Sequence, residues 1–153
     1  MNNKFSLAEQ KGRDYFLKVL EASGCTEIMF TPDPYDKVDV YWTYEGKQYV
    51  GEIKYRMNYK STTKCIKDEG AMLEIKKYKA LKQRERDEGV IPEYIMMFND
   101  GVGFSFTMKG FKPEWVFEEQ KYGKTTMGDT TKIDKYVTYL MYDWAITDFN
   151  FQV

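Results

Sequence analysis

The sequence contains no histidine among its 153 residues. Histidine is the usual general base and the commonest transition-metal ligand, so its absence excludes enzymes that depend on a catalytic histidine. Any catalysis must therefore rest on carboxylates, lysine, tyrosine or cysteine. Cysteine is also scarce, and the two cysteines, Cys25 and Cys65, lie far apart without Cys-x-x-Cys spacing. This pattern indicates free thiols rather than a zinc site or a disulfide framework.

Long apolar runs and a surplus of positive charge are missing as well. No run approaches the roughly 18 apolar residues of a membrane span, and the N-terminal residues lack the apolar stretch of a signal sequence. We therefore expect a cytoplasmic protein with no membrane contact. Lysine and arginine number 23 against 24 acidic residues, which gives a formal net charge of -1. The whole chain thus has no global attraction to nucleic acid, although basic side chains can still gather locally.

The composition is that of an ordered globular protein, with 42% hydrophobic and 17% aromatic residues. Disordered chains are poor in both classes. A length of 153 residues suits one hydrophobic core and is short for two. We therefore expect a single domain over residues 1–153.

Hydrophobic periodicity predicts a mixed α and β chain without internal repeats. Helical spacing occurs over residues 6–23, with Ser6 as the N-cap and Gly24 as the terminator, and over residues 70–89, with an apolar stripe that includes Ala71 and Leu81. Residues 25–31 suit a short strand. Alternating patterns predict hairpins over residues 36–55 and 92–110. Residues 111–153 fit either further strands or a short helix with one strand.

The first hairpin brings an aspartate and a glutamate together. If Glu45 and Gly46 form a two-residue turn, residues whose numbers sum to 91 lie opposite each other. Asp39 then faces Glu52 with Cβ atoms about 5 Å apart, and Lys54 lies two residues along the same face. Val38, Val40, Trp42 and Tyr44 share the other face. A three-residue loop or a bulge would shift this register.

Two opposed carboxylates repel each other by up to about 1 kcal/mol unless a cation lies between them. Oxygen ligands without histidine or cysteine favour a hard cation, Mg²⁺ or Mn²⁺. Such an ion would polarise a phosphodiester and activate a water, while Lys54 would hold that water or neutralise the phosphorus centre. Alternatively, Asp39, Glu52 and Lys54 form a salt-bridged surface ladder, because Glu-x-Lys is common in charged strands.

Two other aspartates precede the hairpin. Asp36 falls opposite Tyr55 on the face of the valines, and Asp33 lies in a turn between two prolines. Neither position faces Glu52. Asp39 is therefore the aspartate that we select.

The segments "VDVYW" (38–42) and "VGEIKYR" (50–56) resemble the motif of the PD-(D/E)xK nuclease superfamily, whose order of helix, strand, hairpin, helix and strand matches residues 6–99. The resemblance implies an α/β, restriction-endonuclease-like core, in which a central mixed sheet contains an antiparallel hairpin and is flanked by helices. It also implies a Mg²⁺-dependent phosphodiesterase. Asp39, Glu52 and the Ile53 carbonyl would be the metal ligands, and Lys54 the catalytic lysine.

Members of this superfamily often add an acidic residue from the first helix, a role that Glu9 matches approximately. The spacing of Ser6 and Glu9 also fits a capping box, which is the better-supported alternative. Glu21 has less support.

Basic residues after the motif are candidates for contact with a phosphate backbone: Arg56, Lys60, Lys64 and Lys77. Lys77 lies one turn after Glu74, and both could point toward the hairpin as similar helices in the superfamily do. The alternative is a solvated helix face made by the basic residues Lys76, Lys79, Lys82, Arg84 and Arg86, with Glu74 in a helix ion pair.

The leading hypothesis is a Mg²⁺- or Mn²⁺-dependent endo- or exonuclease that hydrolyses phosphodiester bonds, most simply in DNA, as in phage or mobile-element DNA processing in the host cytoplasm. A nuclease that cuts both strands would gain from being a homodimer. The alternative is an inactive nuclease-like module that binds nucleic acid or a protein, for example a phage-encoded inhibitor. The even charge balance favours this alternative, because nonspecific DNA enzymes usually carry a basic surplus.

Overall fold

The structure is a computed structural model that describes residues 5–110, 118–123 and 132–153. The helices in these residues are α1 (Leu7–Ala22), α2 (Lys64–Glu69), α3 (Ile75–Glu88) and the 3-10 helix η2 (Tyr142–Trp144). The strands are β1 (Thr26–Phe30), β2 (Val40–Tyr44), β3 (Lys47–Arg56), β4 (Ala71–Glu74), β5 (Ile91–Phe98), β6 (Val102–Thr107), β7 (Glu118–Gly123), β8 (Lys132–Leu140) and β9 (Thr147–Asn150).

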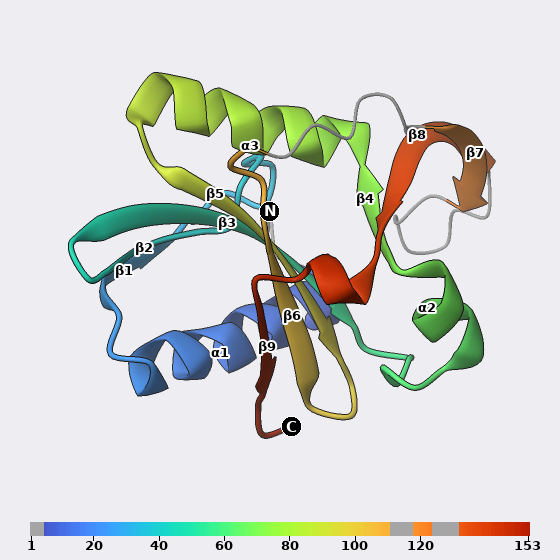
Figure 1. The fold of residues 1–153 in the computed structure, drawn as a ribbon, viewed down its shortest axis with the longest axis horizontal. Helices are drawn as coiled ribbons and strands as arrows, with labels where there is room; N and C mark the ends of the chain where they lie inside the picture. Colours follow the sequence, from blue (N-terminus) through green and yellow to red (C-terminus); the bar gives the residue numbers. More distant parts are fainter. Residues whose placement is uncertain (1–4, 111–117, 124–131) are drawn as a thin grey trace.

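The strands form a six-stranded sheet in the order β1-β2-β3-β5-β6-β9 and a three-stranded sheet in the order β4-β8-β7. Helices α1 and α3 cover opposite faces of the larger sheet (Figure 1). In that sheet β3 and β5 run parallel, and the other neighbouring strands run antiparallel. The predicted central mixed sheet, with an antiparallel hairpin and flanking helices, is confirmed.

The first helix begins after Ser6, as predicted. The Ser6 hydroxyl accepts a hydrogen bond from the Glu9 N–H at 3.2 Å, and the Glu9 carboxylate accepts one from the Ser6 N–H at 3.2 Å. This reciprocal pair is the capping box. A Cβ atom at Gly12 would lie 3.0 Å from the Cβ of Tyr55, so glycine lets α1 approach β3 closely. The close approach brings Arg13 against the sheet.

Strands β2 and β3 form the predicted hairpin. Glu45 and Gly46 make its two-residue turn with φ angles of 49° and 77°, the left-handed values that this tight turn requires. Val40 pairs with Gly51, and every later pair in β2 keeps the same register. Paired residue numbers therefore sum to 91 along β2, as predicted.

The register changes one residue before β2. The Asp39 N–H donates to the Gly51 carbonyl at 2.9 Å, although Gly51 is already the partner of Val40. Asp39 and Val40 are thus both opposite Gly51, as in a β-bulge. The alternation of side chains between the two faces of the sheet is interrupted at this point. Val38 packs in the cluster on the α3 side, whereas Val40 and Trp42 pack on the α1 side. The prediction that Val38 shares their face is wrong, and Asp39 lies at the edge between the two faces.

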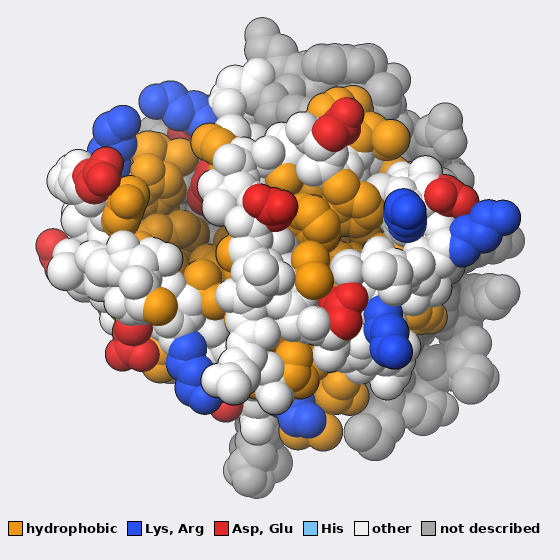
Figure 2. Space-filling view, turned by 60° about the horizontal axis from the view of Figure 1, so that its bottom comes forward, with side chains coloured by type: hydrophobic (Ala, Val, Ile, Leu, Met, Phe, Trp, Pro, Cys, Tyr) orange, Lys and Arg blue, Asp and Glu red, His pale blue; other side chains and the backbone are white. Residues whose placement is uncertain are grey.

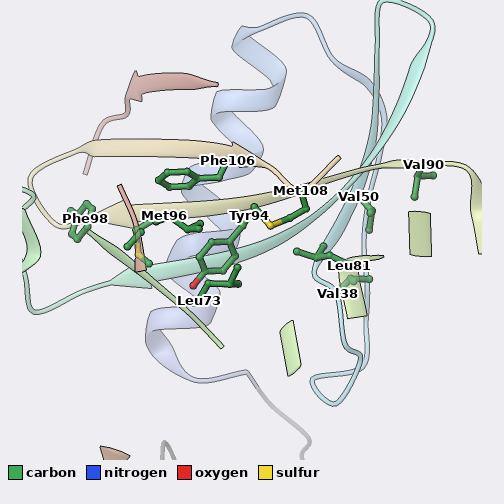
Figure 3. Close-up of a cluster of buried hydrophobic side chains, with 12 residues drawn as sticks. Val38, Val50, Leu73, Leu81, Val90, Tyr94, Met96, Phe98, Phe106 and Met108 are labelled. Carbon is green, nitrogen blue, oxygen red and sulfur yellow. The ribbon is translucent and has the colours of Figure 1, made fainter. Parts of the chain in front are cut away.

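Buried side chains on the α3 side of the sheet form a continuous core (Figure 3). Figure 3 shows Tyr94 and Met96 of β5 beside Phe106 of β6, with Leu73 and Leu81 next to them. These last two residues come from β4 and α3, so the core joins the two sheets and the helix. This packing fixes the position of α3 over β3.

The predicted second helix was too long at its N-terminal end. Residues Ala71–Glu74 form β4, which pairs with β8, and α3 begins at Ile75. Ala71 and Leu73 are buried in alternation, and four residues are too few to separate this period from a helical one. The polar stretch before them contains α2.

The C-terminal part supports the strand alternative. Strands β7, β8 and β9 are present among the described residues after position 111, together with η2. Predictions for residues 111–117 and 124–131 lie outside the described residues. No helix in the part of the chain that the structure describes is long and apolar enough to span a membrane.

Glu93 is a buried carboxylate on β5. Its Oε1 atom accepts a hydrogen bond from the Ser105 hydroxyl at 3.0 Å, and its buried Oε2 atom has no hydrogen-bond partner among the described residues. Burial raises the pKa of Glu93 above its ordinary value of 4.5, although the Thr107 and Ser105 hydroxyls oppose the change. Such a group stabilises the fold below the unfolded-state pKa, and this contribution is lost as the pH rises through the folded-state pKa.

We therefore expect Glu93→Gln to become more stable than the wild type as the pH rises from about 4 to about 8. The gain in unfolding free energy should be on the order of 1 kcal/mol, because the variant removes a poorly partnered buried charge. Urea denaturation at both pH values measures it. Glu45→Gln, in the exposed hairpin turn, is the control. An equal gain in both variants would show that Glu93 is not the cause.

Candidate active site

Glu52 lies in the middle of β3, between β2 and β5. Its side chain points toward α3, where its Oε1 atom lies 2.8 Å from the Lys77 ammonium. The residue is only 7% exposed. A buried carboxylate at the centre of a sheet is costly unless a cation or hydrogen-bond donors compensate it. Its position therefore indicates a site rather than a surface ladder.

Asp39 joins the hairpin to the first helix. Its Oδ2 atom accepts a hydrogen bond from the Ile53 N–H at 2.7 Å, and its Oδ1 atom accepts one from the Arg13 guanidinium at 2.9 Å. Because the bulge breaks the regular ladder, the side chain takes the Ile53 N–H that the backbone leaves unpaired. Asp39 is thereby held in a fixed orientation next to Glu52.

The two carboxylates act on each other. Burial raises the pKa of Glu52, the neighbouring Asp39 carboxylate raises it further, and Lys77 opposes both, with the pKa at about 8. Lys77 thus offsets only part of the tendency of Glu52 toward its protonated form. A cation between the two carboxylates would remove that tendency, because opposite charge favours the ionised form. This arrangement fits a hard cation bound by oxygen atoms.

Lys54 is the next residue on the same face of β3. It is half-buried, and burial lowers its pKa, as does the neighbouring Arg56, while Glu74 and Glu52 raise it. A lysine whose pKa is depressed has an accessible neutral form that can accept a proton. The structure thus places a lysine with altered acidity within electrostatic reach of Glu74 and Glu52.

The first helix contributes Arg13 instead of Glu9. Glu9 is exposed and takes part in the capping box, so its proposed role as a ligand has no support in this geometry. Arg13 follows four residues later on the same helix face. The spacing indicates that Arg13 shares a helix face with Glu9, but the sequence contains no signal that pairs Arg13 with Asp39.

The basic candidates are distributed unequally. Lys77 and Arg56 lie next to the site, since Lys77 pairs with Glu52 and Arg56 acts on Lys54. Lys60 and Lys64 are exposed in the segment after β3. These two residues remain predictions as phosphate contacts.

The basic face of α3 is only partly solvated. Lys76, Lys79 and Arg86 are exposed as predicted. Lys82 instead pairs with Glu85 at 2.6 Å, and Arg84 pairs with Asp36 at 3.0 Å. Asp36 precedes β2, and the expected pairing of Asp36 with Tyr55 is wrong, because the paired residues of β2 and β3 begin at Val40 and Gly51.

The surface outside the site carries both charge signs. On the face in Figure 2, lysine and arginine side chains alternate with acidic ones, and hydrophobic side chains gather between them. In the described ranges, no cluster of three or more His, Cys, Asp or Glu side chains is arranged to hold a metal ion.

No family model and no curated protein matches the sequence. The fold is similar to that of Hjc, a Holliday junction resolvase from the archaeal hyperthermophile Archaeoglobus fulgidus, with a TM-score of 0.55 and 10% sequence identity. The match covers 89% of this chain and 93% of the resolvase chain. At this identity the likeness concerns the fold. The likeness confirms the predicted restriction-endonuclease-like fold.

Proposed function

We propose that this protein is a divalent-metal-dependent nuclease that hydrolyses phosphodiester bonds in DNA. The observation that carries the proposal is that Glu52 interacts with both Asp39 and Lys54, within a nuclease-like fold. A fold by itself does not determine activity, so the proposal depends on the residues of the site. Branched DNA belongs among the substrates because the similar structure is that of a Holliday junction resolvase.

Asp39, Glu52 and the Ile53 carbonyl would hold Mg²⁺ or Mn²⁺. All three donors are oxygen atoms, which is the ligand type that these cations prefer. When bound, the ion would supply Lewis acidity toward a phosphodiester oxygen and lower the pKa of a bound water. The Ile53 N–H bond to Asp39 places this backbone segment beside the first carboxylate.

Lys54 would orient the attacking water or balance the negative charge that develops at phosphorus. Its depressed pKa gives it a neutral form that can take a proton from that water. Arg13 would fix the orientation of Asp39 through their 2.9 Å ion pair. Arg56, next to Lys54, would contact a neighbouring phosphate.

We further propose that residues 1–153 act as one nuclease-like domain and that two copies cooperate on duplex or branched DNA. Cleavage of two strands requires two sites, which a symmetric homodimer would supply. Sedimentation with and without a four-way DNA junction would measure the number of copies. A single copy on the junction would contradict the dimer.

A binding module without activity is the second candidate. The observation in its favour is that both carboxylates already have basic partners, Arg13 for Asp39 and Lys77 for Glu52. A site whose charges are all satisfied internally needs no metal. In that case the protein would grip nucleic acid or a protein partner without cutting it.

Cleavage of labelled duplex, single-stranded and branched DNA and RNA in Mg²⁺ and Mn²⁺ distinguishes the two candidates. We expect cleavage by the wild type and a loss of at least about 10²-fold in Glu52→Gln, because the variant removes a charged metal ligand. Glu45→Gln, on the exposed turn of the same hairpin, is the control and should cut normally.

Calorimetric titration with Mg²⁺ should give binding that depends on both Asp39 and Glu52. A folded wild-type protein that neither binds the ion nor cuts any substrate would favour the binding module. If that protein binds DNA, the affinity should fall with added salt through its phosphate contacts.

A further inference from the structure

Glu52 already has one cation beside it, the ammonium group of Lys77. The Nζ and Oε1 atoms are 2.8 Å apart, and the negative charge of Asp39 also acts on this ammonium. The positive charge of Lys77 is therefore within electrostatic reach of both carboxylates that would hold a metal ion. It lies on the α3 side of the site, above the centre of β3.

The two basic residues at the site are held very differently. Arg13 is only 12% exposed, and its guanidinium donates to the Thr31 carbonyl at 2.7 Å as well as to Asp39. Lys77 is 39% exposed and forms the 2.8 Å ion pair with Glu52, while Glu74 also acts on its charge. Arg13 is thus built into the fold, whereas the more exposed Lys77 ammonium can move into solvent without opening the core.

Electrostatic repulsion disfavours the binding of the Lys77 ammonium and a divalent metal ion to Glu52 at the same time. An ammonium and a divalent ion at the same carboxylate would repel each other in a half-buried site, where the repulsion is stronger than in water. The pair also occupies an oxygen lone pair that a metal ligand needs. Removal of the lysine from Glu52 is the simplest way to accommodate the ion.

We propose that Lys77 is a place-holding counter-ion, so that its ammonium and a divalent cation occupy the Glu52 carboxylate in turn. Metal loading then frees Lys77 at the mouth of the site, where it contacts a phosphate of the substrate. This proposal rests on the proposed metal-dependent function and adds an order to it: the metal binds first, and the lysine then becomes available to the nucleic acid.

The reactivity of individual lysines toward an acetylating reagent tests this exchange. We expect saturating Mg²⁺ to raise the acetylation rate of Lys77 about threefold or more, measured by peptide mass spectrometry, because the ion pair no longer protects the amine. Lys76 and Lys79 lie exposed on the same helix and serve as internal controls that should not change. In Glu52→Gln, Lys77 should react quickly with or without Mg²⁺.

Parallel calorimetry on the same samples separates two kinds of failure. If the wild type binds Mg²⁺ but the reactivity of Lys77 stays the same, the exchange is wrong and the metal site stands. If Mg²⁺ does not bind at all, the proposed function and the exchange both fail. A rise in Lys77 reactivity that is matched by Lys76 would reflect a general opening of the protein and would also overturn the exchange.

DNA binding gives a second measurement. Without divalent ions, Lys77→Gln and the wild type should bind a labelled junction with similar affinity, because Lys77 is engaged by Glu52. In Ca²⁺, which also takes oxygen ligands, Lys77→Gln should bind at least about threefold more weakly than the wild type. Lys76→Gln is the matched control. An equal loss with and without Ca²⁺ would show that Lys77 is never held back by Glu52.

Discussion

Lys54→Met is expected to lower kcat for phosphodiester cleavage by about 10²–10⁴-fold while the protein remains folded. Methionine matches the length of the lysine stem but can neither transfer a proton nor balance charge. Lys54 is half-buried, and burial depresses its pKa, so the loss concerns a group tuned for chemistry rather than a solvated charge. Single-turnover cleavage in Mg²⁺ with a branched or duplex DNA substrate measures the effect.

The unfolding free energy and the Mg²⁺ affinity of Lys54→Met should not fall with its activity. Removal of a partly desolvated charge leaves the unfolding free energy equal or higher. Lys67→Met, at an exposed position in α2, is the control and should change neither kcat nor stability. If Lys54→Met cuts at the wild-type rate, the chemistry does not pass through Lys54 and the site assignment fails.

The pH dependence provides a separate check. If the neutral amine of Lys54 takes the proton from the attacking water, kcat rises with pH until the pH passes the depressed pKa of Lys54. The rise should be absent from the residual activity of Lys54→Met. A wild-type profile that does not change with pH would instead assign Lys54 an electrostatic role at phosphorus.

The hairpin could be predicted from sequence because its information is local. Alternating side chains and the Glu45-Gly46 turn fix the register along β2, and the structure has that register. The bulge at Asp39 could not be predicted in this way. It depends on the hydrogen bond from the Thr31 N–H to the Asp39 carbonyl and on Arg13, which lies 26 residues before Asp39 in the sequence.

Long-range partners explain the other differences. Residues 71–74 form a strand because they pair with β8. The sequence of these four residues does not indicate that partner. Arg84 was expected in solvent, but Asp36 lies close enough to pair with it. Lys77 was correctly considered as a residue pointing toward the hairpin, although its partner Glu52 was not identified. Spacing thus predicts which residues share an element, whereas tertiary packing decides which charges meet.

Arg13→Met is expected to destabilise the protein by about 3–5 kcal/mol, because it leaves Asp39 in a largely buried position without its basic partner. The Arg13 guanidinium also donates to the Thr31 carbonyl, and it stacks over the ring of Phe5 with 3.8 Å to the ring centroid. All of these contacts disappear in the variant. Chemical denaturation measures the change in unfolding free energy.

The same variant should weaken Mg²⁺ binding about 10–100-fold, because a carboxylate that loses its orienting partner is a poorer ligand. Thr31→Val separates this effect from plain destabilisation. It removes the hydrogen bond that the Thr31 hydroxyl accepts from Arg13 at 3.1 Å and those that it donates to the Val38 and Asp39 carbonyls, but leaves the ion pair of Arg13 with Asp39 in place. Thr31→Val should therefore lose stability and keep its Mg²⁺ affinity, while Arg13→Lys should recover part of both. If Thr31→Val weakens Mg²⁺ binding as much as Arg13→Met does, Arg13 supports the fold of this region and does not position Asp39 for the metal.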